Sequence, residues 1–457
     1  MSDEGLRAAV EKMREEGVAD AAINAFEHYY RQLEAGETGL MPEDSIEPVT
    51  DLPHLDELAS DPDAEREALS KAIVLRLNGG LGTSMGLTGA KSLLEAKDGL
   101  SFLDIIARQV LALRAEHDAE LPLVLMDSFS TREDSLAALA EHADLDVGLP
   151  LDFIQNKEPK LLVEDLTPAA WPDNPSLEWC PPGHGDLYTA LVTSGMLEHL
   201  LERGFEYAFV ANSDNLGAVL EPRILAWLRA NEIPFLMEVT ERTEADRKGG
   251  HLARRRSDDR LVLRETAQTP DEDLKALQDL GKHRYANTNN LWVSLRALDA
   301  AMRERDGVLG LPMIRNQKTV DPGDKSSPAV FQIETAMGAA IEVFDGARAL
   351  IVPRTRFAPV KTTDDLLALR SDAYRLTADS RVELVRDSVP IVTLDADHYK
   401  LMRDFDARFP KGPVSLKDAE RFEVEGDVTF GADVVARGSV KVQGPARIED
   451  GTELGAR

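Results

Sequence analysis

Short apolar runs alternate with amphipathic segments between about residues 71 and 240. Strands are expected at 72–77, 121–126, 152–155, 207–211 and 234–239. Helices are expected between them, at 101–116, 131–142, 185–202 and 222–230. This alternation predicts an α/β fold with a mixed, mostly parallel sheet and helices on both faces. In such sheets ligands bind beyond the carboxyl ends of the strands, so the loops after the strands are the places to search for chemistry.

The first 70 residues have a different pattern. Apolar positions at loosely helical spacing predict helices over about 3–35, and a further acidic helix is expected near 61–71 after a stretch rich in Gly and Pro. These segments carry a large share of the negative charge. We therefore interpret them as a solvated helical cap on the main domain, and a partner-binding or autoregulatory arm is the alternative.

The tail carries a six-residue repeat. Its main series is Phe430, Ala436, Val442, Ile448 and Leu454, and a second series of the same period starts at Val428. Period six with small apolar residues is typical of a hexapeptide β-helix, and a left-handed β-helix is expected here, with a chance pattern as the alternative. The open ends of a short β-helix must pack on the main domain or on another subunit.

The chain is expected to have three parts: an N-terminal helical, acidic segment over 1–70, a central α/β domain over 71–385 and a C-terminal domain over 386–457. The chain has 457 residues, a formal net charge of −30 and 43% hydrophobic residues, which suits a chain with a buried core. The acidic balance disfavours nucleic-acid binding. With one cysteine, no signal peptide and no apolar run of membrane-spanning length, we expect a cytoplasmic protein.

A glycine-rich loop follows the first expected strand, from Leu77 to Lys91. Its five glycines allow the backbone to approach a ligand, and successive N–H groups can cradle a phosphate. The loop is not a P-loop, because Ala90 precedes Lys91, and its glycine spacing is one residue too long for a dinucleotide fingerprint. Because Lys91 can reach a phosphate oxygen, the loop indicates a nucleotide site, with an ordinary turn as the alternative.

A second loop places His184 between two glycines, at the expected start of the helix 185–202. The N-terminus of a helix favours anions. A lone histidine is more often structural, but between glycines at a helix start it is better interpreted as a hydrogen-bond donor to a ligand. Cys180 has no base nearby in the sequence and is interpreted as structural.

A third loop places Asp214 directly after the strand 207–211, among Asn212, Ser213 and Asn215. A carboxylate at this edge is a common Mg²⁺ position, because Mg²⁺ takes one or two carboxylates together with substrate phosphates. An Asx turn is the alternative. Zinc is not supported, because the nine histidines and single cysteine form no cluster.

Two further clusters suit a sugar. Amides crowd at Asn287–Asn290 beside an apolar segment, where their burial is costly unless a polar ligand satisfies them. Gly250 and Glu265 flank an expected hairpin around residues 258–259. A second lysine, Lys361, stands in a rigid stretch before a helix, which is noteworthy in so acidic a chain.

These segments occur in the order found in the eukaryotic-type UTP–glucose-1-phosphate uridylyltransferases, and the chain resembles that family over about residues 40–375. The matching segments are Leu77–Lys91, Glu178–Asp186, Asn212–Gly217, Lys248–Gly250, Asn287–Trp292 and Phe357–Thr363. The resemblance implies a Rossmann-like nucleotidyltransferase core and a C-terminal β-helix. It also implies the Mg²⁺-dependent reaction of UTP with α-glucose 1-phosphate to give UDP-glucose and pyrophosphate.

The resemblance further implies a direct in-line attack of the sugar phosphate on the α-phosphorus of UTP, without a covalent intermediate. Lys361 and Lys91 are the implied catalytic residues, and Asp214 is the implied metal ligand. The implied nucleotide-binding residues are Leu77, Asn78, Gly79, Gly80, Gly82, Gln155 and Gly183. Those implied to contact the UDP-sugar are His184, Asn212, Asp214, Gly250, Glu265, Asn287, Asn289 and Asn290.

Three alternatives stay open. In the first, the substrate is another sugar 1-phosphate, of galactose or an N-acetylhexosamine. In the second, the chain is a non-catalytic paralogue that binds UDP-sugar, which the presence of Lys91, Asp214 and Lys361 disfavours. In the third, it is an assembly module built on the β-helix, which leaves the central loops unexplained. No nucleic acid or membrane partner is expected. The tail is expected to form a homo-oligomer or to dock on the core, with self-association slightly favoured.

Overall fold

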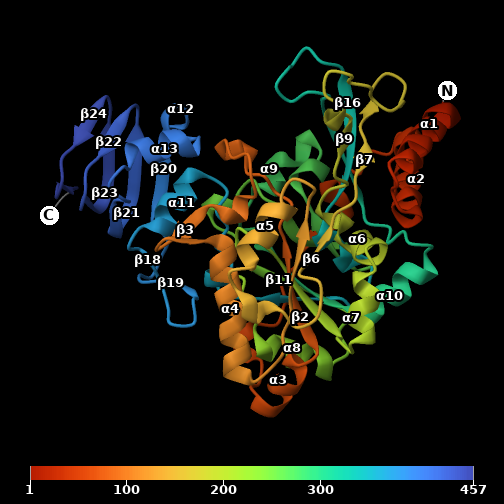
Figure 1. The fold of residues 1–457 in the computed structure, drawn as a ribbon, viewed down its shortest axis with the longest axis horizontal. Helices are drawn as coiled ribbons and strands as arrows, with labels where there is room; N and C mark the ends of the chain where they lie inside the picture. The colour runs from red at the N-terminus through yellow and green to blue at the C-terminus, as the bar shows by residue number, and fades with distance from the viewer. Residues whose placement is uncertain (1, 456–457) are drawn as a thin grey trace. The chain divides into compact units, whose positions relative to one another are not determined.

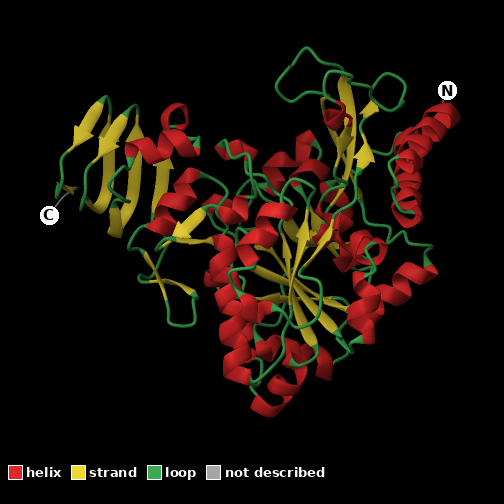
Figure 2. Cartoon of the chain, viewed as in Figure 1, coloured by secondary structure: helices red, strands yellow, loops and turns green. Residues whose placement is uncertain are grey.

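The computed structural model describes residues 2–455, and the chain divides into two compact units. Unit 1 comprises Met1–Leu75, Phe153–Val210 and Glu221–Pro353, and unit 2 comprises Arg76–Asp152, Ala211–Leu220 and Arg354–Arg457. The predicted α/β class is confirmed, with helices around the central strands (Figure 2). None of the helices within residues 2–455 combines the length and apolar character needed to cross a membrane.

The main sheet of unit 1 is mixed. Its strands are β1 (Ile46–Pro48), β10 (Tyr207–Asn212), β11 (Phe235–Glu241), β12 (His251–Arg255), β13 (Leu261–Arg264), β14 (Tyr285–Ser294) and β17 (Arg348–Ile351). Strand β14 pairs antiparallel with β10, β11 and β12, whereas β17 lies parallel to β11. Strands β10, β11, β12 and β17 thus share one direction, and β1, β13 and β14 run in the opposite one. Phe209 and Trp292 pair across β10 and β14, with ring centroids 4.6 Å apart in the core.

Beyond the N-terminal pair, unit 1 has six described helices: those near 61–71 and over 222–230 are confirmed, one predicted helix is divided into two, and the last two were not predicted. The six are α3 (Pro62–Leu69), α6 (Leu187–Thr193), α7 (Met196–Glu202), α8 (Pro222–Ala230), α9 (Leu274–Leu277) and α10 (Leu295–Glu304). The single helix expected over 185–202 is wrong, because α6 and α7 are separate. Gly195 lies between them with φ of +74°, a left-handed conformation that ends the first helix.

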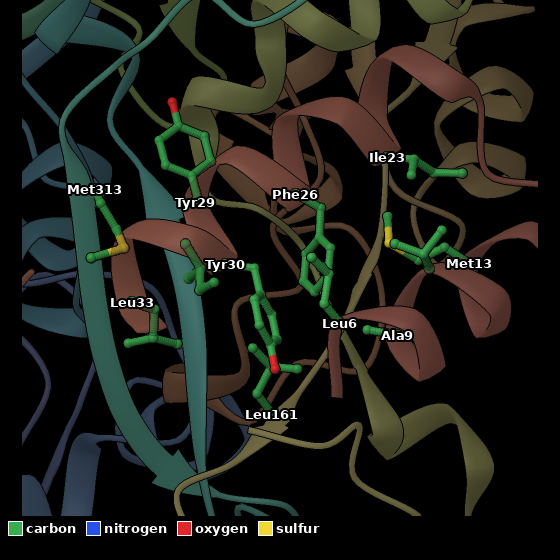
Figure 3. Close-up of a cluster of buried hydrophobic side chains, with 12 residues drawn as sticks. Leu6, Ala9, Met13, Ile23, Phe26, Tyr29, Tyr30, Leu33, Leu161 and Met313 are labelled. Atoms are coloured by element: carbon green, nitrogen blue, oxygen red, sulfur yellow. The ribbon is translucent and has the colours of Figure 1, made fainter. Parts of the chain in front are cut away.

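The N-terminal segment forms the predicted helices as a packed hairpin. Helices α1 (Ser2–Glu15) and α2 (Asp20–Glu34) bury their apolar faces against the sheet of β8 (Leu161–Leu162), β15 (Met313–Thr319) and β16 (Ala329–Thr335). Figure 3 shows Phe26 and Tyr30 of α2 pointing toward Leu6 of α1 and Leu161 of β8. The hairpin is therefore a cap that is packed on one face, with its charged residues on the other.

The carboxyl ends of strands meet in unit 2. Strand β2 (Ala72–Leu77) ends there, as does β10, and β5 (Leu123–Asp127) lies wholly within it. The Ser213 N–H donates to Leu77 O at 3.2 Å, and the Asn78 N–H donates to Met126 O at 2.8 Å. The loops that follow these three strands are therefore adjacent, as the sequence pattern predicts for ligand-binding loops.

Helices and short strands surround these loops in unit 2. The helices are α4 (Phe102–His117), α5 (Arg132–Leu139), α11 (Thr363–Arg370), α12 (Ala396–Tyr399) and α13 (Met402–Arg408). The short strands are β3 (Glu95–Lys97), β4 (Leu100–Ser101), β18 (Tyr374–Leu376) and β19 (Val382–Leu384). The predicted capping box of α4 is confirmed: Asp104 N–H donates to Ser101 Oγ at 3.1 Å and Ser101 N–H donates to Asp104 Oδ2 at 3.0 Å.

The six-residue repeat of the tail forms parallel sheets (Figure 1). One sheet has the order β20-β21-β23-β25 and the other pairs β22 with β24. The strands are β20 (Ile391–Leu394), β21 (Ser415–Glu425), β22 (Val428–Phe430), β23 (Val435–Gln443), β24 (Ala446–Ile448) and β25 (Glu453–Leu454). Phe422 pairs with Val440 and Phe430 with Ile448, so neighbouring strands are offset by three hexads. Apolar residues of the repeat are buried in the earlier hexads, whereas Ile448 and Leu454 in the last are half-exposed.

Candidate active site

The glycine-rich loop of unit 2 folds back on itself. The Lys91 N–H donates to Gly80 O at 3.0 Å, which closes the loop. Gly82 has φ of +62°, and a Cβ added there would lie 2.8 Å from the Leu87 side chain. Gly80, in contrast, is exposed and an added Cβ would contact nothing within 4 Å. The loop thus uses glycine for its own geometry at Gly82 and leaves open space at Gly80 for a ligand.

Asn78 supports this loop from beneath. Its side chain is buried, and Nδ2 donates to Asp127 Oδ1 at 2.7 Å and to Ser135 Oγ at 2.8 Å. Thr131 also donates to Asp127 Oδ1. Burial raises the pKa of Asp127 to about 6. The amide of Asn78 is therefore committed to protein partners, and no local motif indicates the polar network that holds it.

Three of the residues predicted for phosphate and metal chemistry come together in unit 2. Lys91 Nζ donates to Asp214 Oδ2 at 2.8 Å and also to Val360 O, and the Val360 N–H donates to Asp214 O at 3.1 Å. Lys361 follows directly and is exposed, with its N–H held by Asp365 Oδ2 at 2.8 Å within the capping box of α11. Two lysines and one carboxylate are thus presented by loops that hydrogen bonds fix to one another.

Asp214 has the donor chemistry of a metal ligand. Its Oδ1 is buried without a hydrogen-bond partner, while Oδ2 pairs with Lys91. No group of three or more His, Cys, Asp or Glu within residues 2–455 is arranged to hold a metal ion. The residues therefore fit a cation that takes one protein carboxylate and draws its remaining ligands from phosphate oxygens.

A buried arginine shapes the loop that carries Asn212 and Asp214. The guanidinium of Arg76 donates to Asn212 O at 3.3 Å and to Ala218 O. Burial lowers the pKa of Arg76 to about 9. Arg76 interrupts an otherwise apolar run in the sequence, and this break in the pattern is the signal for a buried polar role.

In unit 1, the turn that carries His184 is seated on the end of β16. Gly183 has φ of +80°, and a Cβ there would lie 2.6 Å from Thr335 O. His184 Nδ1 accepts a hydrogen bond of 3.0 Å from the Met337 N–H. In the neutral ring this bond requires the tautomer with its proton on Nε2, so the second ring nitrogen is free to act as a donor, and its donation to a ligand stays a prediction. The long helix expected to start at this turn is wrong, because α6 begins at Leu187 and has only seven residues.

The acid–base state of His184 is testable. His184 is an exposed residue, but nearby protein atoms desolvate its ring and lower its pKa below the ordinary value of 6.5. The neutral form then dominates at pH 7, and the unfolded chain takes up a proton first, so acidification below 6.5 costs stability. We expect the ring protons of His184, followed by NMR, to titrate below pH 6.5. Titration at or above 6.5 would contradict this environment.

The amide cluster of unit 1 is a bulge inside β14. Met237 pairs with Leu291 and Val239 with Asn287, so three residues, 288–290, stand opposite Glu238. Asn289 has φ of +58°, and its side chain and that of Asn287 are half-exposed and bonded to each other at 2.8 Å. Bulges of this kind redirect side chains and are common beside active sites.

Asn290 lies on the buried side of the bulge. Its Nδ2 donates to Glu238 Oε2 at 3.0 Å, and Trp292 donates to the other oxygen of the same carboxylate. The expectation that a polar ligand must satisfy buried amides here is therefore wrong for Asn290, because Glu238 does so. Asn287 and Asn289 remain the accessible amides.

Gly250 and Glu265 lie side by side at the base of the predicted hairpin, which is confirmed as β12 and β13. A Cβ at Gly250 would lie 2.5 Å from Glu265 Oε2. A Cβ at Gly338 would lie 2.8 Å from Asn287 Nδ2, and the N–H of the preceding residue, Met337, donates the hydrogen bond to His184. The segment around Gly338 therefore brings His184 and Asn287 into one neighbourhood of unit 1. Gln155 follows β6 (Asp152–Ile154) and is half-buried.

Comparison with known proteins gives this arrangement a family. The family model described as UTP–glucose-1-phosphate uridylyltransferase matches residues 23–437. The chain belongs to this family.

Relatives of the uridylyltransferase family match over most of the chain. The UTP–glucose-1-phosphate uridylyltransferase of Solanum tuberosum is 43% identical, over 84% of this chain and 79% of the relative, and that of Hordeum vulgare is 39% identical over 98% and 93%. The structure is similar to that of a mutant UDP-glucose pyrophosphorylase from Leishmania major in complex with UDP-glucose, with TM-score 0.93, 45% identity and 98% of each chain covered. A UDP-glucose phosphorylase structure from Trypanosoma brucei gives 0.91, 43% and 99% of each.

Proposed function

We propose that this chain transfers UMP from UTP to α-glucose 1-phosphate and forms UDP-glucose and pyrophosphate. The group formed by Lys91, Asp214 and Lys361 carries the proposal, in a chain that belongs to the uridylyltransferase family. The names of the curated relatives and the UDP-glucose bound to the Leishmania protein support the choice of substrate. The transfer is a direct in-line displacement at the α-phosphorus, with no covalent intermediate.

The two lysines neutralise phosphate charge. Lys361, exposed on a backbone that Asp365 holds, bridges the phosphates as pyrophosphate leaves, and is the principal catalytic residue. Lys91 ends the glycine-rich loop and forms an ion pair with Asp214. Its ammonium can therefore replace this carboxylate partner with a phosphate oxygen when the nucleotide binds. Fixed cations aimed at developing charge stabilise the transition state without reorganisation, and no protein nucleophile is needed.

Mg²⁺ is the cofactor that fits the donor set. Asp214 would hold it through the carboxylate oxygen that has no hydrogen-bond partner. The ion supplies neutralisation of triphosphate charge before the attack. Asp214 also restrains Lys91, so one carboxylate orders both the cation site and the lysine that faces the phosphates.

The remaining predicted residues bind the nucleotide and the sugar. Backbone groups of the loop hold the nucleotide, with Gln155 and the backbone of Gly183. His184 donates a hydrogen bond from Nε2 to the UDP-sugar, and the amides of Asn287 and Asn289 form hydrogen bonds with the sugar hydroxyls. The predicted contributors to these two sets also include Leu77, Asn78, Gly79, Gly80, Gly82, Asn212, Gly250, Glu265 and Asn290. Since the Asn78 and Asn290 side chains are committed to Asp127 and Glu238, these two residues act through the loop and bulge that they support.

A panel of sugar 1-phosphates tests the choice of substrate. With UTP and Mg²⁺, we expect pyrophosphate release with glucose 1-phosphate at a kcat/KM at least about tenfold above that with galactose or N-acetylglucosamine 1-phosphate, because unpaired polar groups in a site reject an ill-fitting hydroxyl. Coupled detection of pyrophosphate measures this. Preference for another sugar 1-phosphate would change the assigned sugar substrate but not the assigned reaction, uridylyl transfer.

The architecture serves this reaction in three parts: the N-terminal segment over 1–70, the catalytic domain over 71–385 and the C-terminal domain over 386–457. The three-hexad register of the tail supports assignment of its parallel sheets to the coils of a left-handed β-helix. The acidic charge of −30 supports a cytoplasmic protein that binds neither nucleic acid nor membrane.

The last hexads of the tail support self-association. Ile448 and Leu454 are half-exposed, and burial against a second copy would cover them. We expect full-length protein to be a dimer by light scattering. Deletion after Phe422, or the paired change Ile448→Asp and Leu454→Asp that keeps the coils intact, should halve the mass. If the full-length protein is already a monomer, and deletion lowers its mass only by the mass of the deleted residues, self-association is contradicted. Docking on the core is then the remaining role of the tail.

A further inference from the structure

The nucleotide-binding residues proposed for unit 1 come from two separate segments. Gln155 follows β6, whereas Gly183 and His184 form a turn almost thirty residues later. A site for UTP in unit 1 needs these segments in a fixed arrangement. The turn is fixed from one side by β16, where the Thr335 N–H donates to Pro182 O at 2.9 Å and the Met337 N–H donates to His184.

One buried carboxylate joins the two segments. Asp186 ends the short 3₁₀ helix His184–Asp186 and is only 5% exposed. Its Oδ2 accepts the Asn156 N–H at 2.6 Å, and its Oδ1 accepts Asn156 Nδ2–H at 2.8 Å. Asn156 is the residue after Gln155, and its own Oδ1 accepts from Thr193 Oγ1 of α6 at 3.2 Å. A shift of either segment therefore breaks charge-assisted bonds at its neighbour.

Burial and hydrogen bonding act in opposite directions on the charge of Asp186. Together with Asn156, Glu158 and Tyr29, it lines a cavity of about 30 Å³ beneath the N-terminal hairpin. Glu158 is also buried, its Oε1 has no hydrogen-bond partner, and burial together with the nearby Asp186 raises its pKa well above the usual range. Burial raises the pKa of Asp186 to about 6, and the hydrogen bonds from Asn156 oppose that rise and favour the charged form.

We propose that Asp186 is a positioning residue for UTP: its carboxylate locks Gln155 and the Gly183–His184 turn into the arrangement that receives the nucleotide. This inference rests on the proposed function. Asp186 acts through Asn156 and need not contact substrate. Preorganisation of this kind stabilises binding by removing the cost of ordering a loop.

The test uses two variants of the full-length protein. Asp186→Asn keeps the shape but places an N–H against one of the two donors of Asn156. We expect KM for UTP to rise about tenfold to a hundredfold, the range for a lost hydrogen bond to a charged group, with much smaller changes in kcat and in KM for glucose 1-phosphate. Asn156→Ala removes one of the two bonds to Asp186, together with the bond from Thr193, and should raise KM for UTP by about three- to tenfold. The double variant should be no worse than Asp186→Asn alone.

A matched control separates positioning from stability. Asp104→Asn removes a carboxylate that likewise accepts a backbone N–H and a side-chain donor, in the capping box of α4. It should lower the melting temperature without a change in KM for UTP. Unchanged KM for UTP in Asn156→Ala and Asp186→Asn, or equal effects on both substrates, would overturn the proposal. Absence of UDP-glucose formation by the wild type would instead contradict the proposed function itself.

Discussion

Replacement of Lys361 by alanine is expected to reduce turnover by about 10²–10³, equivalent to roughly 3–4 kcal/mol of transition-state stabilisation. The side chain is exposed, and its backbone N–H, not its ammonium, is held by Asp365. Loss of the ammonium therefore removes a positive charge that faces the phosphates, and the backbone of the loop keeps its position. Affinity for UTP should change far less than kcat. Steady-state kinetics with calorimetric titration of UTP separate the two effects.

Lys411 provides the matched control for that variant. It is another exposed lysine of unit 2, paired with Asp450 in the tail. Lys411→Ala should leave kcat within about twofold of the wild type, since surface ion pairs contribute little. Near-normal turnover in Lys361→Ala would remove Lys361 from the catalytic role, and an equal loss in both variants would point to a general effect of charge.

Removal of divalent cations is expected to abolish activity, and Mg²⁺ should restore it, because the triphosphate charge must be neutralised before attack. Asp214→Asn should raise the Mg²⁺ concentration for half-maximal activity by about tenfold or more, the loss typical of a charge-assisted contact. The same change removes the partner of Lys91, so kcat at saturating Mg²⁺ should fall as well. Activity is measured across a Mg²⁺ titration after treatment with EDTA.

Asp165→Asn is the control for the metal titration. This exposed carboxylate accepts bonds only from the nearby Thr167 among the contacts that the structure shows. Its Mg²⁺ requirement should equal that of the wild type. If Asp214→Asn shows the same Mg²⁺ dependence as the wild type, Asp214 is a turn residue and the cation is held elsewhere.

The sequence pattern predicts elements well where one local rule decides them. Helix α8 begins at the predicted Pro222, and Ser101 with Asp104 caps α4, because both signals act within one helical turn. The six-residue repeat of the tail reappears as the register of its parallel strands, because burial of one side chain in six is itself periodic. The glycine-rich loop and Asp214 follow their strands as expected, because ligand loops sit at strand ends.

The pattern fails where distant residues decide the outcome. Gly195 breaks the helix expected over 185–202, and its left-handed φ is not visible in amphipathic spacing. Asn289 bulges out of β14 because of pairing with β11, some fifty residues earlier. Similarly, Asn78 is committed to Asp127 across residues that share no local motif. Motifs therefore indicate the loops in which chemistry is expected, but not which amides the protein itself satisfies.

The most direct test of the account is product formation by the purified protein. UTP, α-glucose 1-phosphate and Mg²⁺ are mixed with the full-length chain, and the phosphorus NMR spectrum is followed in time. The account predicts equimolar UDP-glucose and pyrophosphate, and the reverse formation of UTP when those two products are supplied. Binding of UDP-glucose without turnover in either direction would contradict it and would identify a non-catalytic UDP-sugar-binding protein.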